Sequence, residues 1–172
     1  LICVPTPLKN NKPNLEYIIS TYSNIKNYLR EKQVLILEST SYPGTTREIL
    51  SRELSKKFIL GKNFFLGFSS ERINPGLNEN YIQKIPKVVS GYSKNCLKII
   101  TSFYKKFFHQ VVEAKSLEIA EFSKLVENIY RAINIGFINE MKIVADKMNL
   151  DIYEILKVAK TKPFGFQAFY PG

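Results

Sequence analysis

The chain has 172 residues, of which 45% are hydrophobic and 23% are charged. This is the composition of an ordinary globular protein with enough apolar residues for one good core, and no apolar run is long enough to span a membrane. Cys3 and Cys96 have no metal-binding spacing and the single histidine, His109, precedes an apolar run, so no zinc or other metal site is expected. Since these residues contain no secretory signal, we expect a reduced, cytoplasmic protein.

The net charge of +10 admits three interpretations. It can follow from a lysine-rich genome, from a nucleic-acid surface or from a site for a small anionic ligand. A nucleic-acid surface needs a basic stripe or a recognisable module, whereas the lysines here are scattered, as at Lys9, Lys56, Lys105 and Lys142. The scatter favours the first interpretation, so we expect no nucleic-acid partner and no membrane partner.

Short apolar runs alternate with helical stretches along most of the chain. Asn14, Ser93 and Asp151 suit the N-cap positions of three of these helices. Because the apolar runs are short, continuous and separated by helices, the pattern predicts a parallel α/β sheet covered on both faces. Strands are expected at residues 1–4, 34–37, 64–68, 87–90 and 111–112, and helices at residues 15–29, 45–54, 93–107 and 152–158.

Residues 116–149 predict one long helix, since they contain no proline and a single glycine, Gly136. Ser116 suits its N-cap, and Asn149 suits its exit because Asn tolerates the left-handed conformation. Apolar residues cover most of the circumference of this helix. We therefore expect the helix to be buried, either in a core or against a partner.

Three polar residues interrupt this apolar helix at Lys124, Asn128 and Arg131. Their i, i+4, i+7 spacing places them on one face. One interpretation is a solvated strip on a helix with one wet side. The other is a polar patch that faces a ligand across a cleft, because buried Lys and Asn side chains are costly without partners.

Polar loops rich in proline and glycine follow the first three predicted strands: P-T-P at residues 5–7, E-S-T-S-Y-P-G-T-T at 38–46 and S-S-E-R-I-N-P-G at 69–76. In open α/β sheets, ligands bind beyond the carboxyl ends of the strands. Residues 43–45 also resemble the start of a helix, whose free N–H groups favour an anion. The loops together indicate a ligand site, although the sequence contains no G-x-G-x-x-G motif and no P-loop.

The polar side chains of these loops each have a structural alternative. Thr6, Ser39 and Thr40 can contact a ligand, or they can cap the next helix or turn. Glu71 and Arg72 can form a surface ion pair of little consequence. Alternatively, Glu71 can act as a general base beside a cation that holds an anionic substrate.

Six motifs stand in order along the chain: I-C-V-P-T-P, E-S-T-S-Y-P-G-T-T, S-S-E-R-I-N-P-G, I-P-K-V-V-S-G, A-E-F-S-K-L-V-E-N-I-Y-R-A-I-N-I-G-F-I-N-E and T-K-P-F-G-F-Q-A-F-Y-P-G. Their order and spacing resemble those of the nucleotide-sugar dehydrogenases of the UDP-glucose/GDP-mannose dehydrogenase type. The resemblance covers essentially the whole chain. The K-P-F-G-F segment is most similar to the UDP-N-acetyl-D-glucosamine 6-dehydrogenase branch.

This resemblance implies an NAD-dependent oxidation of the C6 alcohol of a UDP-sugar to a carboxylate, in which two NAD+ are consumed. In the family, a cysteine traps the aldehyde and passes through a thioester, which is then hydrolysed. The resemblance also implies a role in surface polysaccharide precursor synthesis. We expect the long helix to pack against a second copy and form a homodimer.

The resemblance assigns catalytic and substrate roles to five residues. Lys124 corresponds to the lysine that stabilises oxyanionic intermediates, and Asn128 corresponds to the asparagine that binds the substrate or its ordered water. Glu71 corresponds to the glutamate of thioester hydrolysis and, with Arg72, is expected to contact the substrate. Arg131 is expected to bind the sugar or its acyl group.

The cofactor side of the site is expected in the first two loops. Thr40 corresponds to the threonine of the S-T motif, near the nicotinamide and the catalytic water, and is expected to serve both cofactor binding and catalysis. Thr6, together with Pro5, corresponds to a cofactor-side threonine. The resemblance implies NAD as the cofactor and no metal.

The chain departs from the family pattern in three places. UDP-glucose enzymes carry a second glutamate four residues after the first, where this chain has Pro75, and this favours the N-acetylhexosamine branch. The G-G-H-C motif with the nucleophilic cysteine would follow Gly172, and the glycine-rich phosphate loop would precede Leu1. Neither Cys3 nor Cys96 is expected to replace that nucleophile. We therefore expect an internal piece of a longer enzyme that is inactive on its own.

The predicted fold is the second half of a Rossmann-like parallel sheet in residues 1–113, followed in residues 114–172 by the long central helix and the start of an all-α substrate and dimerisation domain. Antiparallel strands, or a break in the helix near Gly136, would contradict this prediction. Two functional alternatives stay open. The substrate can be UDP-glucose or GDP-mannose, or the chain can be a non-catalytic basic binding module.

Overall fold

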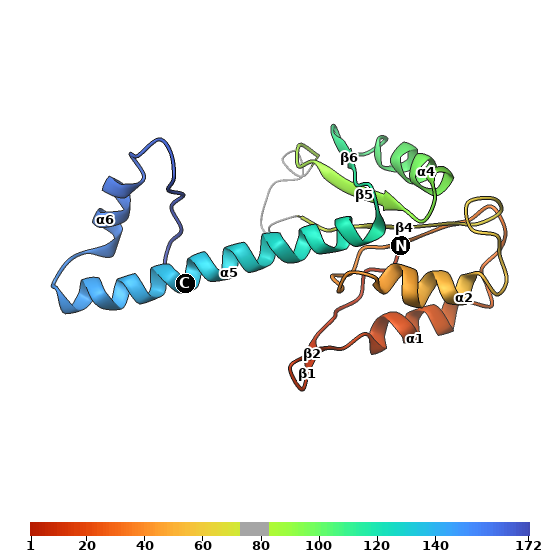
Figure 1. The fold of residues 1–172 in the computed structure, drawn as a ribbon, viewed down its shortest axis with the longest axis horizontal. Helices are drawn as coiled ribbons and strands as arrows, with labels where there is room; N and C mark the ends of the chain where they lie inside the picture. Colours follow the sequence, from red (N-terminus) through yellow and green to blue (C-terminus); the bar gives the residue numbers. More distant parts are fainter. Residues whose placement is uncertain (73–82) are drawn as a thin grey trace. The chain divides into compact units, whose positions relative to one another are not determined.

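The computed structural model describes residues 1–72 and 83–172 (Figure 1). The chain divides into two compact units, Leu1–Leu125 and Val126–Gly172, which are described in turn. Among the described residues, no helix is both long enough and apolar enough to cross a membrane.

The first unit is built on a four-stranded sheet with the strand order β3-β4-β5-β6. Its strands are β3 (Val34–Leu37), β4 (Phe65–Ser69), β5 (Lys87–Gly91) and β6 (Val111–Glu113). β3 pairs with β4 in parallel, and β5 pairs with β6 in parallel. The predicted fold class, an α/β sheet that leads into a long central helix, is confirmed.

The β4 and β5 strands run antiparallel, so the predicted parallel direction is wrong for this one pair. An apolar run that is buried on both faces looks the same in either direction, so the sequence pattern did not distinguish them. Ser69 is the partner of Val89 in this pair. The first residue of β5, Lys87, therefore lies at the edge of the sheet where β3 and β4 end.

The first four residues, predicted as a strand, form a single parallel bridge in which Ile2 pairs with Leu37. The pairing stops there because the Val4 N–H donates to the Ser39 hydroxyl at 2.8 Å and a proline follows. The predicted strand therefore lies beside β3 as expected, but it is shorter than predicted.

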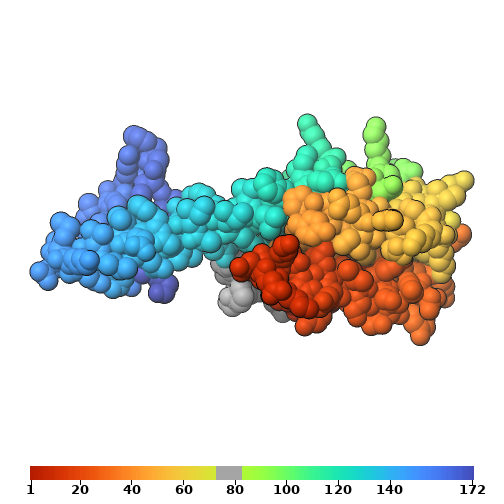
Figure 2. Space-filling model, turned by 60° about the horizontal axis from the view of Figure 1, so that its bottom comes forward, coloured from red at the N-terminus to blue at the C-terminus, as the bar shows by residue number. Residues whose placement is uncertain are grey.

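Helical segments cover both faces of this sheet (Figure 1). One core joins α1, η1 and α2 to β3 and β4, and a second core joins α4 to β3 and β5. Figure 2 shows α1 and the η1–α2 segment side by side on the surface of this unit. The helix predicted at residues 45–54 is present, but its first part is a π-helix, which is wider than an α-helix. The segments are α1 (Glu16–Ile25), η1 (Thr46–Ser51), α2 (Arg52–Leu54) and α4 (Lys94–Tyr104).

The side chains of β3 alternate between these two cores. Leu35 and Leu37 belong to the core with α1 and α2, whereas Ile36 belongs to the core with α4. In β4, Gly67 allows α4 to approach closely, since an added Cβ would lie 2.2 Å from Cδ1 of Ile100. This double cover explains why the strands are continuous apolar runs.

A short hairpin, β1 (Leu8–Lys9) with β2 (Lys12–Pro13), precedes α1 in a stretch for which no strand was predicted. Its two-residue turn is formed by Asn10 and Asn11, with φ angles of 53° and 58°. Both angles lie in the left-handed region that a tight hairpin turn needs and that Asn tolerates.

Hydrogen bonds confirm the predicted helix caps. Ser93, Ser116 and Asp151 each accept a backbone N–H of the following turn, at distances of 2.8 to 3.2 Å. Asn14 accepts the N–H of the first residue of α1 at 2.8 Å. These bonds satisfy N–H groups that have no partner inside their helices. At the far end of the long helix, Asn149 has the predicted left-handed conformation, with a φ of 54°.

The long helix α5 (Leu117–Lys147) is continuous for 31 residues and passes through Gly136 without a break, as predicted. Many of its apolar side chains are about half exposed in this chain. Within the described residues, the predicted burial is therefore not found for these side chains, and burial against a partner stays a prediction. These side chains are Ile119, Phe122, Val126, Ile129, Tyr130, Ile133, Phe137, Ile143 and Val144.

The second unit contains the rest of α5, the helix α6 (Ile152–Ala159) and the final loop. Its small core joins Ile138 and Ala145 of α5 to Ile152 and Leu156 of α6. The rings of Phe166 and Phe169 pack against this core and hold the final loop beside α5 (Figure 1).

The free space around Gly136 generates a prediction about stability. An added Cβ at Gly136 meets no atom within 4 Å, so Gly136→Ala should raise the free energy of unfolding by about 0.5–1 kcal/mol through lower backbone entropy in the unfolded chain. Gly67→Ala is the matched control and should lower it by roughly 1–3 kcal/mol through overpacking. Thermal unfolding followed by circular dichroism measures both. A lower melting temperature for Gly136→Ala would contradict this account.

Candidate functional site

The loop after the first bridge and the loop after β3 meet at one edge of the sheet. The Thr6 hydroxyl donates to the Thr40 carbonyl at 2.7 Å, which brings together the two threonines predicted for the cofactor. Thr40 is exposed. Thr6 is half-buried, and Pro5, which precedes it, is exposed. Ser39 was considered either as a ligand contact or as a structural cap. Its hydroxyl accepts the Val4 N–H at 2.8 Å and so joins the two loops, which is a structural role.

Within the described residues, three buried hydroxyls lack a hydrogen-bond partner: Ser41, Ser70 and Thr101. Ser41 lies in the loop after β3, and Ser70 directly follows β4. Because β3 and β4 are parallel neighbours, both hydroxyls lie at the edge that carries Thr6 and Thr40. Buried polar atoms are normally satisfied, so this edge has spare hydrogen-bonding capacity for a polar ligand or an ordered water.

Glu71 follows β4 and stands exposed at the same edge. One of its carboxylate oxygens accepts the Arg72 backbone N–H at 2.7 Å, and the other lies 3.4 Å from the Lys87 ammonium. The Arg72 guanidinium donates to the Pro86 carbonyl at 3.1 Å. Glu71 therefore forms an ion pair with a buried lysine of β5.

That lysine, Lys87, belongs to a cluster of charged and aromatic groups. Its ammonium lies 3.3 Å from the Glu38 carboxylate and stands 5.2 Å and 5.5 Å from the ring centres of Tyr104 and Phe108. The Tyr104 hydroxyl donates to Glu38. Burial, reinforced by this bond to Glu38, raises the pKa of Tyr104 well above its usual value, so the hydroxyl is protonated at neutral pH.

Both cysteines, Cys3 and Cys96, are free thiols, and Cys96 is buried. Burial raises the pKa of the Cys3 thiol, and the nearby Glu38 carboxylate, which accepts the S–H at 3.8 Å, raises it further. A thiol with a raised pKa is a poor nucleophile at neutral pH. This environment favours the prediction that neither cysteine performs a nucleophilic step.

A buried carboxylate fastens α5 to the loop after β3. Glu121 is fully buried, and its two oxygens accept the Gly44 N–H at 2.6 Å, the Thr46 N–H at 2.9 Å and the Thr46 hydroxyl at 2.7 Å. Burial raises the pKa of the Glu121 carboxyl, while the bonds from Thr46 and Gly44 oppose that rise. Residues 43–45 were expected to offer N–H groups to an anion. The structure shows that the N–H groups of Gly44 and Thr46 are bound by a carboxylate from within the chain.

The predicted polar patch lies on α5. Lys124 is half-buried, belongs to the first unit and lies three residues after the buried Glu121. Asn128 and Arg131 are exposed and belong to the second unit. Their spacing on a continuous helix keeps the three on one face. Their assignment to catalysis and substrate binding stays a prediction.

An ion pair holds the first turn of α5 from its other side. Arg47 Nε lies 2.5 Å from a carboxylate oxygen of Glu118, and the Arg47 guanidinium also stacks 5.3 Å from the ring centre of Tyr92. The hydrogen bond from Arg47 lowers the pKa of Glu118 to about 2, from a usual value of 4.5. Both side chains are partly exposed, so solvent weakens this pair.

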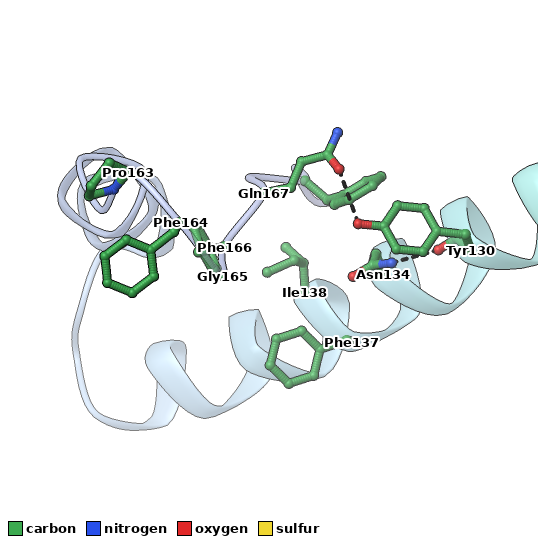
Figure 3. A pocket seen from close by; sticks show the side chains of 10 residues that line it. Tyr130, Asn134, Phe137, Ile138, Pro163, Phe164, Gly165, Phe166 and Gln167 are labelled. Carbon is green, nitrogen blue, oxygen red and sulfur yellow. Dashed lines mark hydrogen bonds between the residues drawn. The ribbon is translucent and has the colours of Figure 1, made fainter.

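The second unit contains a pocket of about 460 Å³ between α5 and the final loop (Figure 3). The Tyr130 hydroxyl is bonded to the Gln167 side-chain oxygen at 3.0 Å, and the Asn134 amide donates to the Tyr130 carbonyl at 2.7 Å. Aromatic walls with a few polar groups are typical of pockets for small organic ligands. The lining also includes Phe137, Pro163, Phe164, Phe166 and Phe169, most of them from the K-P-F-G-F segment and its continuation.

The sheet with hydroxyl-bearing loops at its strand ends, followed by a long helix, is the arrangement of α/β proteins that bind their ligands beyond the carboxyl ends of the strands. Comparison with known families agrees. Residues 1–108 match the NAD binding domain of the UDP-glucose/GDP-mannose dehydrogenase family, and residues 118–172 match the central domain of the same family. The chain therefore belongs to the UDP-glucose/GDP-mannose dehydrogenase family, as the resemblance predicted, and NAD is the cofactor that its first domain serves.

Individual relatives cover the whole chain. It is 38% identical to Protein CapL of Staphylococcus aureus over 176 residues, and 35% identical to a UDP-N-acetyl-D-glucosamine 6-dehydrogenase of Pseudomonas aeruginosa over 178 residues, with 100% of the chain aligned in both. These alignments cover 41% and 42% of the relatives, so the chain spans about two fifths of their length. The solved structure of a UDP-D-ManNAc dehydrogenase from Pyrococcus horikoshii superposes with a TM-score of 0.91 at 28% identity, and the match covers 99% of this chain and 41% of that one.

Sequence reasoning missed two residues of this region, Glu121 and Lys87. Glu121 had a detectable signal, because it lies one helical turn after the apolar Leu117 and so falls on the buried face of α5. Lys87 had a weaker one. It begins the apolar strand K-V-V-S-G, but its burial depends on the antiparallel direction of β5, which the sequence did not reveal.

The Arg47–Glu118 pair predicts a dependence of stability on pH. Since the pKa of Glu118 is lowered to about 2, the pair stabilises the fold above pH 4.5, and its contribution is lost as the pH falls to about 2. Glu118→Gln should therefore lower the free energy of unfolding by about 0.5 kcal/mol at pH 7 and leave it nearly unchanged at pH 2.

Urea unfolding at both pH values measures this difference. Glu140→Gln, at an exposed position of the same helix, is the matched control and should show a smaller change at pH 7. An equal loss for Glu118→Gln at both pH values would mean that the side chain acts through packing and not through its charge.

Proposed function

We propose that this chain is an internal part of an enzyme that oxidises the C6 alcohol of a UDP-N-acetylhexosamine, with UDP-GlcNAc as the first candidate, to a carboxylate with two NAD+. The product would serve surface polysaccharide precursor synthesis. The observation that carries the proposal is the match along the whole chain to a UDP-N-acetyl-D-glucosamine 6-dehydrogenase at 35% identity. We place the division between the cofactor domain and the helical domain at residues 113 and 114.

Pro75 supports the N-acetylhexosamine branch at the level of sequence, and it lies outside the described residues. UDP-glucose and GDP-mannose are the alternative substrates, and the UDP-D-ManNAc dehydrogenase among the similar structures keeps the identity of the hexosamine open. The free thiols of Cys3 and Cys96 support a reducing compartment, the cytoplasm, as the location.

The edge of the sheet fits NAD by the character of its side chains. Thr6 and Thr40 stand together there, and the buried hydroxyls of Ser41 and Ser70 have spare hydrogen-bonding capacity within the described part of the chain. We propose that Thr6, Thr40 and the backbone at Pro5 hold the nicotinamide half of the cofactor. When bound, NAD+ supplies the acceptor for the hydride that leaves the sugar C6.

The chain's own residues would act around that position. The Lys124 ammonium would stabilise the negative charge that develops on the substrate oxygen, and Asn128 would hold the substrate or its attacking water. Glu71 would take a proton from the water that attacks the thioester carbon and return it to the sulfur when the C–S bond breaks. Arg72 and Arg131 would contribute positive charge toward the substrate.

The exposed apolar side chains of α5 support a homodimer. A long helix with half-exposed Ile, Val and Phe residues is unusual on a free surface and typical of a buried interface. We propose that the exposed apolar side chains of α5 pack against the same helix of a second copy in the complete protein, as in a two-fold symmetric dimer.

The proposed function predicts substrate-dependent NADH formation by the complete protein that contains this chain. UDP-GlcNAc should give two NADH per sugar, measured at 340 nm, with UDP-ManNAc, UDP-glucose and GDP-mannose as the competing substrates. The 172 residues alone should form none and should bind NAD+ weakly. If no nucleotide sugar yields NADH and the protein instead retains nucleic acid in a strongly salt-dependent way, the basic binding module is the better hypothesis.

The role of Lys124 predicts a loss of turnover. In the complete protein, Lys124→Ala should lower kcat by about 10²- to 10³-fold and change the affinity for NAD+ much less, because one oxyanion donor acts mainly in the transition state. Lys142→Ala removes a lysine from the same helix, away from this patch, and should retain the activity of the unchanged enzyme. An unchanged kcat for Lys124→Ala would remove this lysine from the catalytic residues.

A further inference from the structure

Lys87 carries a buried charge that the proposed mechanism does not use. Its side chain is 5% exposed, and lysine is rarely buried to this extent unless it is paired. Removing an ammonium from water is costly, so a buried lysine needs partners that compensate for the lost hydration. Lys87 has two carboxylate partners at this edge of the sheet: Glu38, which follows β3, and Glu71, which follows β4.

The first partner, Glu38, holds Lys87 in place. The carboxylate of Glu38 is 3.3 Å from the ammonium, is 11% exposed and accepts hydrogen bonds from the Tyr104 hydroxyl and the Cys3 thiol. The rings of Tyr104 and Phe108 flank the same ammonium. With a carboxylate and two rings fixed around it, the ammonium has little freedom to move.

The second partner, Glu71, is more exposed than Glu38. Its side chain is 47% exposed, and one of its carboxylate oxygens lies 3.4 Å from the Lys87 ammonium. The other carboxylate oxygen accepts the Arg72 backbone N–H at 2.7 Å. Because β4 and β5 are antiparallel, Lys87 lies across from the residues that follow β4, and this direction creates the pair.

We propose that Lys87 is a positioning residue for Glu71: the buried ammonium, fixed by Glu38, holds the Glu71 carboxylate at the edge of the sheet in the orientation that thioester hydrolysis requires. This inference deepens the proposed function and rests on it for the role of Glu71. In this proposal Lys87 acts through the Glu71 carboxylate and not through a contact with substrate or cofactor.

The experiment compares Lys87→Met, Lys87→Arg and the double variant Lys87→Met/Glu38→Gln in the complete protein. Methionine keeps the length and removes the charge, and arginine restores it. The double variant avoids leaving the Glu38 carboxylate buried without a cation, so it remains informative if Lys87→Met does not fold.

Stopped-flow measurement of NADH separates oxidation from hydrolysis. Since both NADH form before the thioester is hydrolysed, Lys87→Met and the double variant should each show a burst of two NADH per site, followed by a steady rate lowered about tenfold or more. The KM values for sugar and NAD+ should change little, and Lys87→Arg should recover most of the rate. A steady rate close to that of the unchanged enzyme, or a fall in rate without a burst, would overturn the proposal.

A spectroscopic measurement tests the positioning of Glu71 without depending on activity. In protein with ¹³C-labelled glutamate carboxyls, the Glu71 resonance, assigned by its loss in Glu71→Gln, should move in Lys87→Met and in the double variant and stay near its original position in Lys87→Arg. A resonance that does not move would overturn the proposal. If the unchanged protein forms no NADH while the resonance moves, the proposed function fails and the positioning of Glu71 by Lys87 stands.

Discussion

The carboxylate of Glu121 is the contact on which the arrangement of the first unit depends. It is fully buried, and it accepts two backbone N–H groups and one hydroxyl from Gly44 and Thr46. A buried charge is tolerated when hydrogen bonds replace its water, and two N–H groups at the start of a helix also supply favourable partial charges. The single side chain therefore joins the start of α5 to the loop that carries Thr40, and it sets the position of Lys124, three residues further along the helix.

A second charged contact organises the same edge from the opposite strand. Lys87 reaches the edge because β5 runs against β4, and it meets Glu38 and Glu71, which follow the two parallel strands. Glu121 and Lys87 thus have a feature in common: each is a buried charged side chain that contacts groups at the end of a strand of the sheet. Such pairs contribute little net stability, because desolvation offsets the attraction, but they define one geometry where several are possible. The position of the functional groups is accordingly fixed by charge and the stability of the unit by its two apolar cores.

Local chemistry was predictable from the sequence, and long-range pairing was predictable only in part. The bounds of β3 and the caps Ser93, Ser116 and Asp151 followed from short-range patterns, as did the passage of the long helix through Gly136. The meeting of Thr6 with Thr40 followed from the rule that parallel strands end at one edge. The direction of β5 could not be predicted, because an apolar run looks the same in either direction. The roles of Glu121 and Lys87 could not be predicted either, because they depend on contacts between residues far apart in the chain.

The antiparallel pair has a consequence for the rigidity of this edge. The residues that follow β4 are joined to the residues that begin β5 by the hydrogen bond from Arg72 to the Pro86 carbonyl and by the pair of Glu71 with Lys87. Two contacts between the same two short stretches resist rotation of one stretch against the other, which a single contact does not. The proposed general base is therefore held at the end of β4 by its own side-chain contact and by that of its neighbour in the chain.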